Sequence, residues 1–473
     1  MYHFLQAWLS AFPQYNPGTR PNNTVTGPAE VNLFVESYGG LYGPIFALYL
    51  EEMNAMRRNG SFPFNKTLEI SLASLGIVNG MIDVKTQTGY DPRFAGNNTY
   101  GIQAISQLSM YNTITAFEQP GGCSDMVNQC RAGQAMNQFG DNTQIDFICY
   151  SALGQCNDIQ NTYSTSGLSF YDIRQDFPSP IPSEAYLEYL NSGQVMQSLG
   201  VQVNYTESSN AVYYDFGATG DEINYVLSDL ATLLSMNVRV ALIYGDADYI
   251  CNWLGGEAVS LQLAQVAPYP YTLNFGVAGY ADIVTNETYV GGEVRQYGNL
   301  SFARIYNAGH QVPAYQPETA FQVFARVIFG TALATGQPID ASTYRTTGPP
   351  NSTYQSSAGA SAPNVCWVRA APDACTAPQL ADMQAGKGVV LHGVWYENAS
   401  QYTPPASTVA AGKPGTPLPS TPAGSATGSA SVAPTGVFVA TATPSPHKGG
   451  AGRTVVGGVW VAGVALAAVV AGW

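Results

Sequence analysis

The sequence predicts an α/β protein whose central sheet is mostly parallel and covered by helices on both faces. Two observations predict this class. Apolar segments of strand length recur at 31–35, 68–78, 237–245 and 300–309, and stretches of helical character lie between them. Strands that are apolar along both faces are typical of a parallel sheet buried on both sides. We expect the globular part to span residues 1–400.

The first predicted elements surround a short polar turn. The N-terminal residues MYHFLQAWLSAF indicate an amphipathic helix and not a signal peptide, since they lack a positive region and a small-residue cleavage site. The strand at 31–35 leads through Glu36-Ser37-Tyr38-Gly39-Gly40 into a helix over 41–58. The next strand ends at Asn79-Gly80, a dipeptide typical of turns.

A different composition separates the second strand from the third. Residues 98–235 are rich in Gln, Asn and Tyr and contain four cysteines. We expect this segment to form an insertion over the sheet, such as a helical cap. The strands at 237–245 and 300–309 then complete the predicted sheet.

Charge and glycosylation motifs point to a secreted protein. The formal net charge is −14 with only 18 Lys and Arg, so no basic face can form to neutralise nucleic-acid phosphates. N-x-[ST] motifs occur at nine positions, which together favour a glycoprotein: Asn22, Asn59, Asn65, Asn97, Asn204, Asn286, Asn299, Asn351 and Asn398.

The seven cysteines agree with secretion. The first four allow three pairings, of which we favour the nested one, Cys123–Cys156 with Cys130–Cys149. Cys366 and Cys375 can close a local loop, which leaves Cys251 unpaired. The alternative is a set of buried thiols in a cytosolic protein.

The C-terminal part differs from the rest of the chain. Residues 401–448 are rich in Ser, Thr, Pro, Ala and Gly, so we expect a disordered, O-glycosylated stalk. Residues 449–473 combine small residues with a terminal apolar run, which is the layout of a GPI attachment signal. Gly449 and Gly450 are the candidate attachment points. A plain tail-anchored helix is the alternative. We therefore expect a protein at the cell surface, bound to the plasma membrane or cell wall.

Three polar side chains stand where predicted strands end. A serine hydroxyl needs a base to remove its proton, and the base needs a carboxylate to orient it. Ser37, Asp248 and His310 each follow an apolar strand and occur in the order nucleophile, acid, base. The other histidines suit this role less well by their positions: His3, His392 and His447.

The sequences of these segments resemble those of the serine carboxypeptidases, a family with the α/β-hydrolase fold. The chain carries VESYGGLYGP, GDADYICNWLGG and NAGHQVPAYQPE, together with FLQAWLSAFPQY and NNTYGIQAI. The resemblance covers residues 1–330 and is strongest to secreted, GPI-anchored fungal members. It implies cleavage of single amino acids from peptide and protein C-termini at acidic pH through an acyl-enzyme, with no metal or cofactor.

The resemblance also implies a role for each site residue. Ser37 matches the nucleophile, His310 the base and Asp248 the acid, whereas the nearby Asp246 is expected to serve the turn. The remaining matches are to groups that contact substrate. They are Glu36 for the terminal carboxylate, the Tyr38 N–H for the oxyanion, Cys251 for the substrate site and Gln311 for the leaving-group pocket.

Two departures from the family pattern qualify this expectation. Val35 occupies a position where most such turns have Gly, and a β-branched side chain crowds a tight turn. Only 36 residues precede Ser37, although family members carry a longer N-terminal segment with an N-G-G-P-G-like loop that supplies a second oxyanion donor. We expect a truncated chain whose strand at 31–35 exposes an apolar edge. The alternatives are an inactive, GPI-anchored wall glycoprotein and an esterase or acyltransferase on the same fold.

Overall fold

A computed structural model describes residues 1–15, 29–61, 67–136, 142–177, 185–286, 289–357, 366, 368, 371, 375–391 and 394–402, and the backbone of 463–465. Its main sheet has the order β4-β5-β6-β3-β2-β1-β9. The strands are β1 (Ala29–Glu36), β2 (Ile70–Val78), β3 (Arg239–Gly245), β4 (Ala281–Asn286), β5 (Tyr289–Tyr297), β6 (Leu300–Ile305) and β9 (Gly463–Ala465).

The centre of this sheet is parallel and one edge is antiparallel. β1, β2, β3 and β6 run in the same direction. β5 and β4 continue the sheet as an antiparallel hairpin beside β6. On its other side β1 pairs with β9 over three residues, Asn32 to Phe34. The predicted open edge of the strand at 31–35 therefore has a partner over part of its length.

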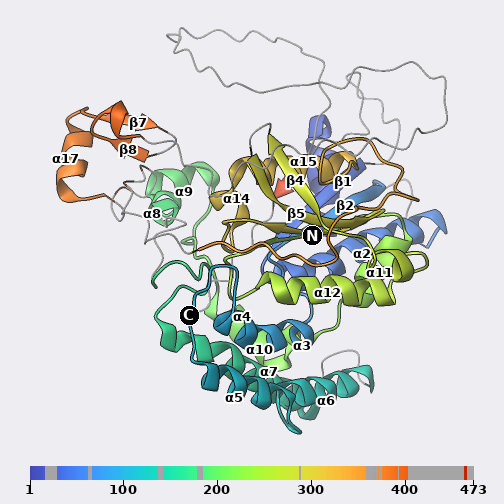
Figure 1. Ribbon diagram of the computed structural model, residues 1–473. Helices are drawn as coiled ribbons and strands as arrows, with labels where there is room; N and C mark the ends of the chain where they lie inside the picture. Colours follow the sequence, from blue (N-terminus) through green and yellow to red (C-terminus); the bar gives the residue numbers. More distant parts are fainter. Residues whose placement is uncertain are drawn as a thin grey trace.

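Helices cover both faces of the sheet, as the sequence predicts (Figure 1). α2 (Gly39–Arg58), α11 (Leu227–Ser235) and α12 (Trp253–Val266) lie on one face, and α15 (Pro317–Phe329) lies on the other. The burial of β3 explains the arrangement. Leu242 and Tyr244 pack into the core under α11 and α12, whereas Ala241 and Ile243 pack into the core with α15. Such two-sided burial is typical of parallel strands between helical layers.

Shorter helices connect these layers or follow them in the chain. They are α1 (Tyr2–Ala11), α3 (Val84–Gln87), α4 (Asp91–Gly96), α13 (Tyr271–Asn274), α14 (Val312–Tyr315) and α17 (Ala377–Gln384). α1 buries Tyr2, Leu5 and Leu9 against α2 and the start of β2. Near the end of the described chain, α17 and the two-stranded sheet β7 (Val389–Leu391) and β8 (Val394–Tyr396) form a small unit (Figure 1).

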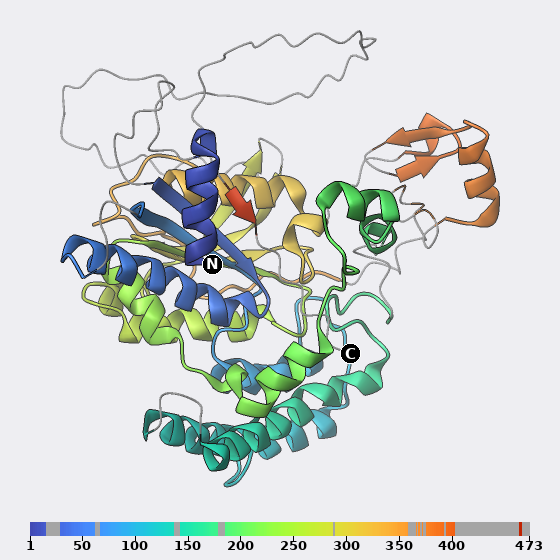
Figure 2. The same cartoon turned by 180° about the vertical axis from the view of Figure 1, so that it is seen from behind.

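The segment predicted as an insertion is mostly helical. It contains α5 (Gln107–Glu118), α6 (Cys123–Met136), α7 (Thr143–Asn161), α8 (Ala185–Leu190), α9 (Gly193–Leu199) and α10 (Asn210–Thr219). α5, α6 and α7 lie together on the side of the molecule away from β4 and β5 (Figures 1 and 2). α11, at the end of the segment, packs against the central sheet.

The disulfide predictions are confirmed. Cys123–Cys156 and Cys130–Cys149 join α6 to α7, and their four sulfur-bearing side chains form the centre of a small core. Cys366 and Cys375 form the third bridge, and Cys251 is a free, buried thiol.

Two other predictions fall largely outside the described residues. Residues 403–448 of the predicted stalk (401–448) and most of the apolar tail lie there, as does His392. Within the described residues, the structure contains no helix both long and apolar enough to cross a membrane.

Candidate active site

The three predicted catalytic side chains follow strands that end at the same edge of the sheet. Ser37 follows β1, Asp248 lies three residues after β3, and His310 lies five residues after β6. β6 and β3 are parallel neighbours, so the loops carrying His310 and Asp248 start side by side. In open α/β sheets, ligands bind outside the carboxyl ends of the strands.

Ser37 occupies a sharp turn between β1 and α2. Its φ of 59° is in the left-handed region, which is uncommon for a residue with a side chain. The turn is fixed by its backbone, because Ser37 N donates to Val78 O and Ser37 O accepts from both Gly40 N and Met81 N. A strained serine at a strand-to-helix turn is the geometry that α/β hydrolases use to present a nucleophile.

Val35 fits into this turn because two glycines face it. A Cβ atom on Gly39 would lie 2.7 Å from Val35 Cβ, and one on Gly43 would lie 2.9 Å from Val35 Cγ2. Real side chains do not approach so closely, so α2 can pack against Val35 only while both positions lack a side chain. The crowding that the sequence predicts at Val35 is therefore avoided because α2 has glycine at the two positions that face it.

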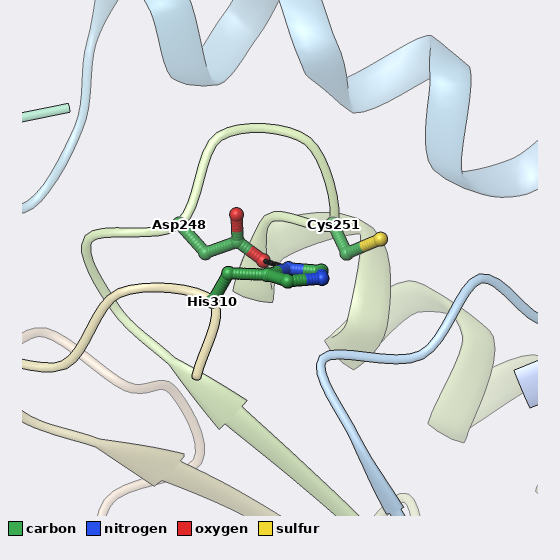
Figure 3. Close-up of side chains that lie close together, drawn as sticks. All are labelled: Asp248, Cys251 and His310. Carbon is green, nitrogen blue, oxygen red and sulfur yellow. Dashed lines mark hydrogen bonds and ion pairs between the residues drawn. The ribbon is translucent and has the colours of Figure 1, made fainter. Parts of the chain in front are cut away.

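Asp248 and His310 form a buried pair (Figure 3). Asp248 Oδ2 lies 2.8 Å from His310 Nδ1, and both side chains are almost fully buried. The same carboxylate oxygen accepts a 2.7 Å hydrogen bond from the Asn79 side chain. His310 is further held by its backbone N–H, which donates to Tyr171 O, and the Tyr171 ring lies 5.0 Å from the imidazole.

The charges around this pair favour a protonated imidazole. Burial lowers the pKa of His310, but the charge and hydrogen bond of Asp248, with a contribution from Glu36, outweigh it and raise the pKa above 6.5. Glu36 is itself shifted. Burial and the charge of Asp248 raise its pKa above 4.5, against the opposing effect of His310. A carboxyl group in this state retains its proton above the usual pH range.

The structure separates Asp246 from Asp248. Asp246 is completely buried, and among the described residues no hydrogen bond or ion pair joins its side chain to His310. Its Oδ1 accepts from the Tyr100 hydroxyl and from Asn307 N at 2.9 Å, and its Oδ2 lies 3.5 Å from Arg304. Asp246 thus ties the loop after β3 to the loop that carries His310, while Asp248 contacts the imidazole.

Cys251 lies beside the pair. In Figure 3 the Cys251 side chain lies next to the imidazole and comes from the loop that also carries Asp248. Within the described part of the chain, Asp248, Cys251 and His310 are the set with metal-ligand spacing, since their ligand atoms lie within 4.8 Å of one another. Asp248 and His310 bond to each other, however, which suits an acid–base pair. Burial and the charge of Asp248 raise the pKa of the thiol well above 9.0, so it stays protonated.

For the remaining predicted residues, Tyr38 and Gln311, the structure gives the position and local contacts. The Tyr38 hydroxyl donates to Asp221 Oδ2 at 2.5 Å, and its backbone N–H has no hydrogen-bond partner among the described residues. Gln311 precedes α14 at the N-cap position. Among the described residues no hydrogen bond joins the Ser37 side chain to His310; in unliganded enzymes such contacts are often longer than in complexes.

Two contacts in this site were missed by sequence analysis. The sequence indicates only a turn at Asn79-Gly80, yet the Asn79 side chain donates a hydrogen bond to Asp248. Asn79 directly follows β2, the strand that lies between β1 and β3 in the sheet, and its φ is 40°. A polar residue at the end of an apolar central strand was the available signal. Tyr171, in the insertion, had no comparable signal.

The fold and the arrangement of the strand-end residues define an α/β hydrolase. Comparison with protein families agrees, because residues 1–330 match the serine carboxypeptidase family, peptidase family S10. The chain belongs to this family.

Relatives in fungi include two carboxypeptidase S1 homologs of Arthroderma otae. Homolog A is 38% identical over 86% of this chain and 63% of its own length, and homolog B is 41% identical over 74% and 52%. Carboxypeptidase S1 of Penicillium janthinellum is 32% identical over 69% and 70%. The chain therefore spans less than two thirds of the first two relatives. Kex1(delta)p, a prohormone-processing carboxypeptidase from Saccharomyces cerevisiae, is similar in structure with a TM-score of 0.48 and 20% identity over 68% of this chain and 64% of its own.

Proposed function

We propose that this protein removes single amino acids from the C-termini of peptides and proteins. The observation that supports this most strongly is the 2.8 Å contact between Asp248 and His310, next to a serine held at positive φ at the same sheet edge. Ser37 Oγ attacks the carbonyl carbon of the last peptide bond as His310 takes the hydroxyl proton. Asp248 stabilises the imidazolium that forms, and the proton then passes to the leaving amino group.

The acyl-enzyme is hydrolysed by the reverse sequence. His310 removes a proton from water, and the resulting attack releases the shortened peptide and restores the Ser37 hydroxyl. The Tyr38 N–H, which is free among the described residues, supplies one donor to the oxyanion in both steps. Cys251 and Gln311 are proposed to line the site, as the family resemblance implies.

Glu36 explains why the enzyme would prefer the end of a chain to an internal peptide bond. It stands next to Ser37, and its raised pKa keeps part of its population protonated above pH 4.5. A protonated carboxyl group can donate to the carboxylate of a substrate, whereas an ionised one repels it. An internal peptide bond presents no such carboxylate, and therefore binds without this interaction.

The full chain should be tested on an N-blocked dipeptide acid and on the matching dipeptide amide. We expect release of the free C-terminal amino acid from the acid only, and covalent labelling of Ser37 by a fluorophosphonate. Ser37→Ala should remove both the turnover and the label. Hydrolysis of simple esters without amino acid release would favour an esterase, and an unlabelled Ser37 in the folded chain would favour an inactive protein.

We also propose that the protein is a secreted glycoprotein held at the cell surface by a GPI anchor at Gly449 or Gly450. The small residues and apolar run of 449–473 support the anchor. Phosphatidylinositol-specific phospholipase C should release the protein from fungal membranes. Retention, with the tail peptide still detectable by mass spectrometry, would favour a tail-anchored helix.

Among the glycosylation motifs that the structure describes, one differs from the others. Asn299 is only 9% exposed, and its side-chain amide donates to Asn237 Oδ1 at 2.8 Å. Asn97, Asn286 and Asn351 are exposed. We expect glycopeptide mass spectrometry to find sugar on the exposed motifs and an unmodified Asn299, since a glycan there would break the contact with Asn237.

A further inference from the structure

Residues 350–356, which we call the strap, lie against β5 and β6, because Ser352 contacts a residue on each of these strands. Exposure alternates along the strap, as expected for an extended chain whose side chains point to opposite sides in turn. The exposed residues are Asn351, Thr353 and Gln355, and the partly buried ones are Ser352, Tyr354 and Ser356. The strap lies outside residues 1–330, which match the family, so the family comparison assigns it no role.

Arg304, near the end of β6, is a completely buried cation. Among the described residues its guanidinium donates hydrogen bonds to three acceptors, two of which belong to the strap. Ser352 Oγ accepts from Nη1, and the Tyr354 carbonyl accepts from Nη2 at 2.8 Å. The third acceptor, Thr99 Oγ1, lies 3.0 Å from Nη2. A buried charge is costly unless it is hydrogen-bonded, so the strap is a main determinant of where this guanidinium lies.

The strap also sets how Arg304 meets its two carboxylates. Ser352 Oγ donates to Glu293 Oε1, which lies 3.5 Å from Arg304 Nη1. Asp246 Oδ2 also lies 3.5 Å from the guanidinium, and it has no hydrogen-bond partner among the described residues. A guanidinium that lost its strap acceptors would move onto this oxygen, because an unsatisfied buried donor is costly and a carboxylate is a strong acceptor. The strap therefore holds Arg304 short of a direct hydrogen bond with Asp246.

Asp246 is in turn bound to the loop that carries His310. Its Oδ1 accepts from Asn307 N at 2.9 Å, and Asn307 lies three residues before His310. Asn307 has a φ of 56°, a left-handed conformation that is uncommon for a residue with a side chain. Such a conformation persists only where the surrounding contacts fix it. Movement of Asp246 toward Arg304 would weaken the contact at Asn307 N and loosen the loop.

A second contact joins the strap to the start of the same loop. The Tyr354 ring stacks on the Tyr306 ring, with 3.8 Å between centroids and 22° between the ring planes. Tyr306 is only 4% exposed and directly precedes Asn307 in the chain. Packing against the strap therefore restricts Tyr306, while the hydrogen bond to Asp246 restricts Asn307. Two consecutive residues at the start of the loop thus depend on the strap.

We propose that the strap positions the loop that carries His310, and that Ser352 and Tyr354 are the positioning residues. Ser352 acts through Arg304, and Tyr354 acts through Tyr306. The inference rests on the proposed function, because it concerns the imidazole that takes the proton of the nucleophile. Since both residues act on the position of this base, their loss should lower kcat and leave KM unchanged.

The first test compares Ser352→Ala with Ser352→Thr in the full chain, on the N-blocked dipeptide acid. Ser352→Ala removes an acceptor of Arg304 but keeps the glycosylation motif at Asn351, since Thr353 is unchanged. We expect its kcat to fall about tenfold with KM unchanged, because a small displacement of a catalytic group is costly. Ser352→Thr retains the hydroxyl and should restore most of the lost activity.

Tyr354→Leu tests the second contact with less risk to folding. It keeps an apolar side chain and the main-chain acceptor of Arg304, but it removes the ring that stacks on Tyr306. We expect kcat to fall about threefold with KM unchanged, since one of the two contacts to the loop remains. Tyr354→Phe keeps the ring and should restore most of the lost activity.

Thr353→Ala is the matched control. Thr353 is exposed and lies between the two positioning residues, and its loss also removes the glycosylation motif at Asn351. It should change neither kcat nor KM. A fall in kcat in this control equal to that in Ser352→Ala would overturn the proposal. Lower melting temperatures with unchanged kcat in Ser352→Ala and Tyr354→Leu would overturn it too, since the strap would then serve stability alone.

The rate at which a fluorophosphonate labels Ser37 separates this inference from the proposed function. Labelling requires His310 to remove the serine proton, but it needs no peptide and no release of an amino acid. We expect the labelling rate to fall in Ser352→Ala by the same factor as kcat and to recover in Ser352→Thr. An unchanged rate would overturn the positioning role alone. Slower labelling of a chain that releases no amino acid would overturn the proposed function alone, and a wild-type chain that is not labelled would overturn both.

Discussion

Asn79 donates its side-chain amide to Asp248 Oδ2 at 2.7 Å, the same oxygen that lies 2.8 Å from His310 Nδ1. The Asn79 side-chain oxygen also accepts from Gly245 N at 3.0 Å. One residue at the end of β2 thus ties down the end of β3 and the carboxylate that orients the imidazole. Hydrogen bonds to charged groups contribute about 1.5–3 kcal/mol.

Asn79→Ala should therefore reduce kcat about 10- to 100-fold with little change in KM, since it disturbs the orientation of Asp248 and not substrate contacts. Stopped assays of amino acid release at several substrate concentrations measure both constants. Asn79→Asp is the informative second variant. Its added carboxylate should raise the pKa of His310 further and move the acidic limb of kcat to higher pH. Unchanged kcat in Asn79→Ala would contradict this role.

Substitutions of the two aspartates after β3 should have different effects. Asp248→Asn should lower kcat by about 10⁴, because an amide cannot hold the imidazole as a carboxylate does. Asp246→Asn should lower activity far less but reduce thermal stability, since it leaves the buried Arg304 with one carboxylate, Glu293, in place of two. Activity and melting temperature of both variants decide the matter. Equal catalytic loss in a well-folded Asp246→Asn would reverse the assignment of the acid.

The sequence was sufficient to predict which residues form the site, but not the contacts between them. Buried strands are evident as apolar runs, and residues just after parallel strands converge at one edge, so Ser37, Asp248 and His310 could be placed together. The cysteine spacing favoured the nested disulfides among three possible pairings, and the structure confirms them. The choice between Asp246 and Asp248 depended on family resemblance, because both follow the same strand.

Contacts between distant segments were beyond the sequence. Asn79 and Asp248 are 169 residues apart, and their meeting depends on the pairing of β2 with β3. Tyr171 belongs to the insertion, and its sequence surroundings do not indicate that it contacts His310. The relief of Val35 by Gly39 and Gly43 likewise depends on how α2 packs over β1.

That packing gives a prediction about stability. Gly43→Ala should destabilise the protein by about 1–3 kcal/mol, since the added methyl group meets Val35 at 2.9 Å. Val35→Ala alone should also destabilise, by about 1–2 kcal/mol through lost apolar burial. The double variant should be less destabilised than the sum, because each change makes room for the other. Urea unfolding of the four proteins measures this coupling, and simple additivity would show that the two side chains do not compete.

The last prediction concerns the pH dependence of substrate binding. Burial and Asp248 raise the pKa of Glu36 above 4.5, and Asp248 and Glu36 raise that of His310 above 6.5 despite its burial. The proposed mechanism needs a protonated Glu36 and a neutral His310. Lowering the pH should therefore decrease kcat as His310 becomes protonated, and raising it should increase KM as Glu36 loses its proton and repels the substrate carboxylate. In Glu36→Gln the rise of KM with pH should disappear, because an amide does not titrate, while the acidic limb of kcat should remain. A peptide amide has no terminal carboxylate, so its inhibition constant as a competitor should not rise with pH in either protein.

Stability provides a readout independent of turnover. A carboxyl whose pKa is higher in the folded state stabilises the fold fully below its unfolded pKa, and that contribution is lost as the pH rises through the folded value. The melting temperature of the wild-type chain should accordingly fall more steeply above pH 4.5 than that of Glu36→Gln. Parallel KM and melting curves for the two proteins would show that Glu36 does not hold the proton that the proposed carboxylate site requires.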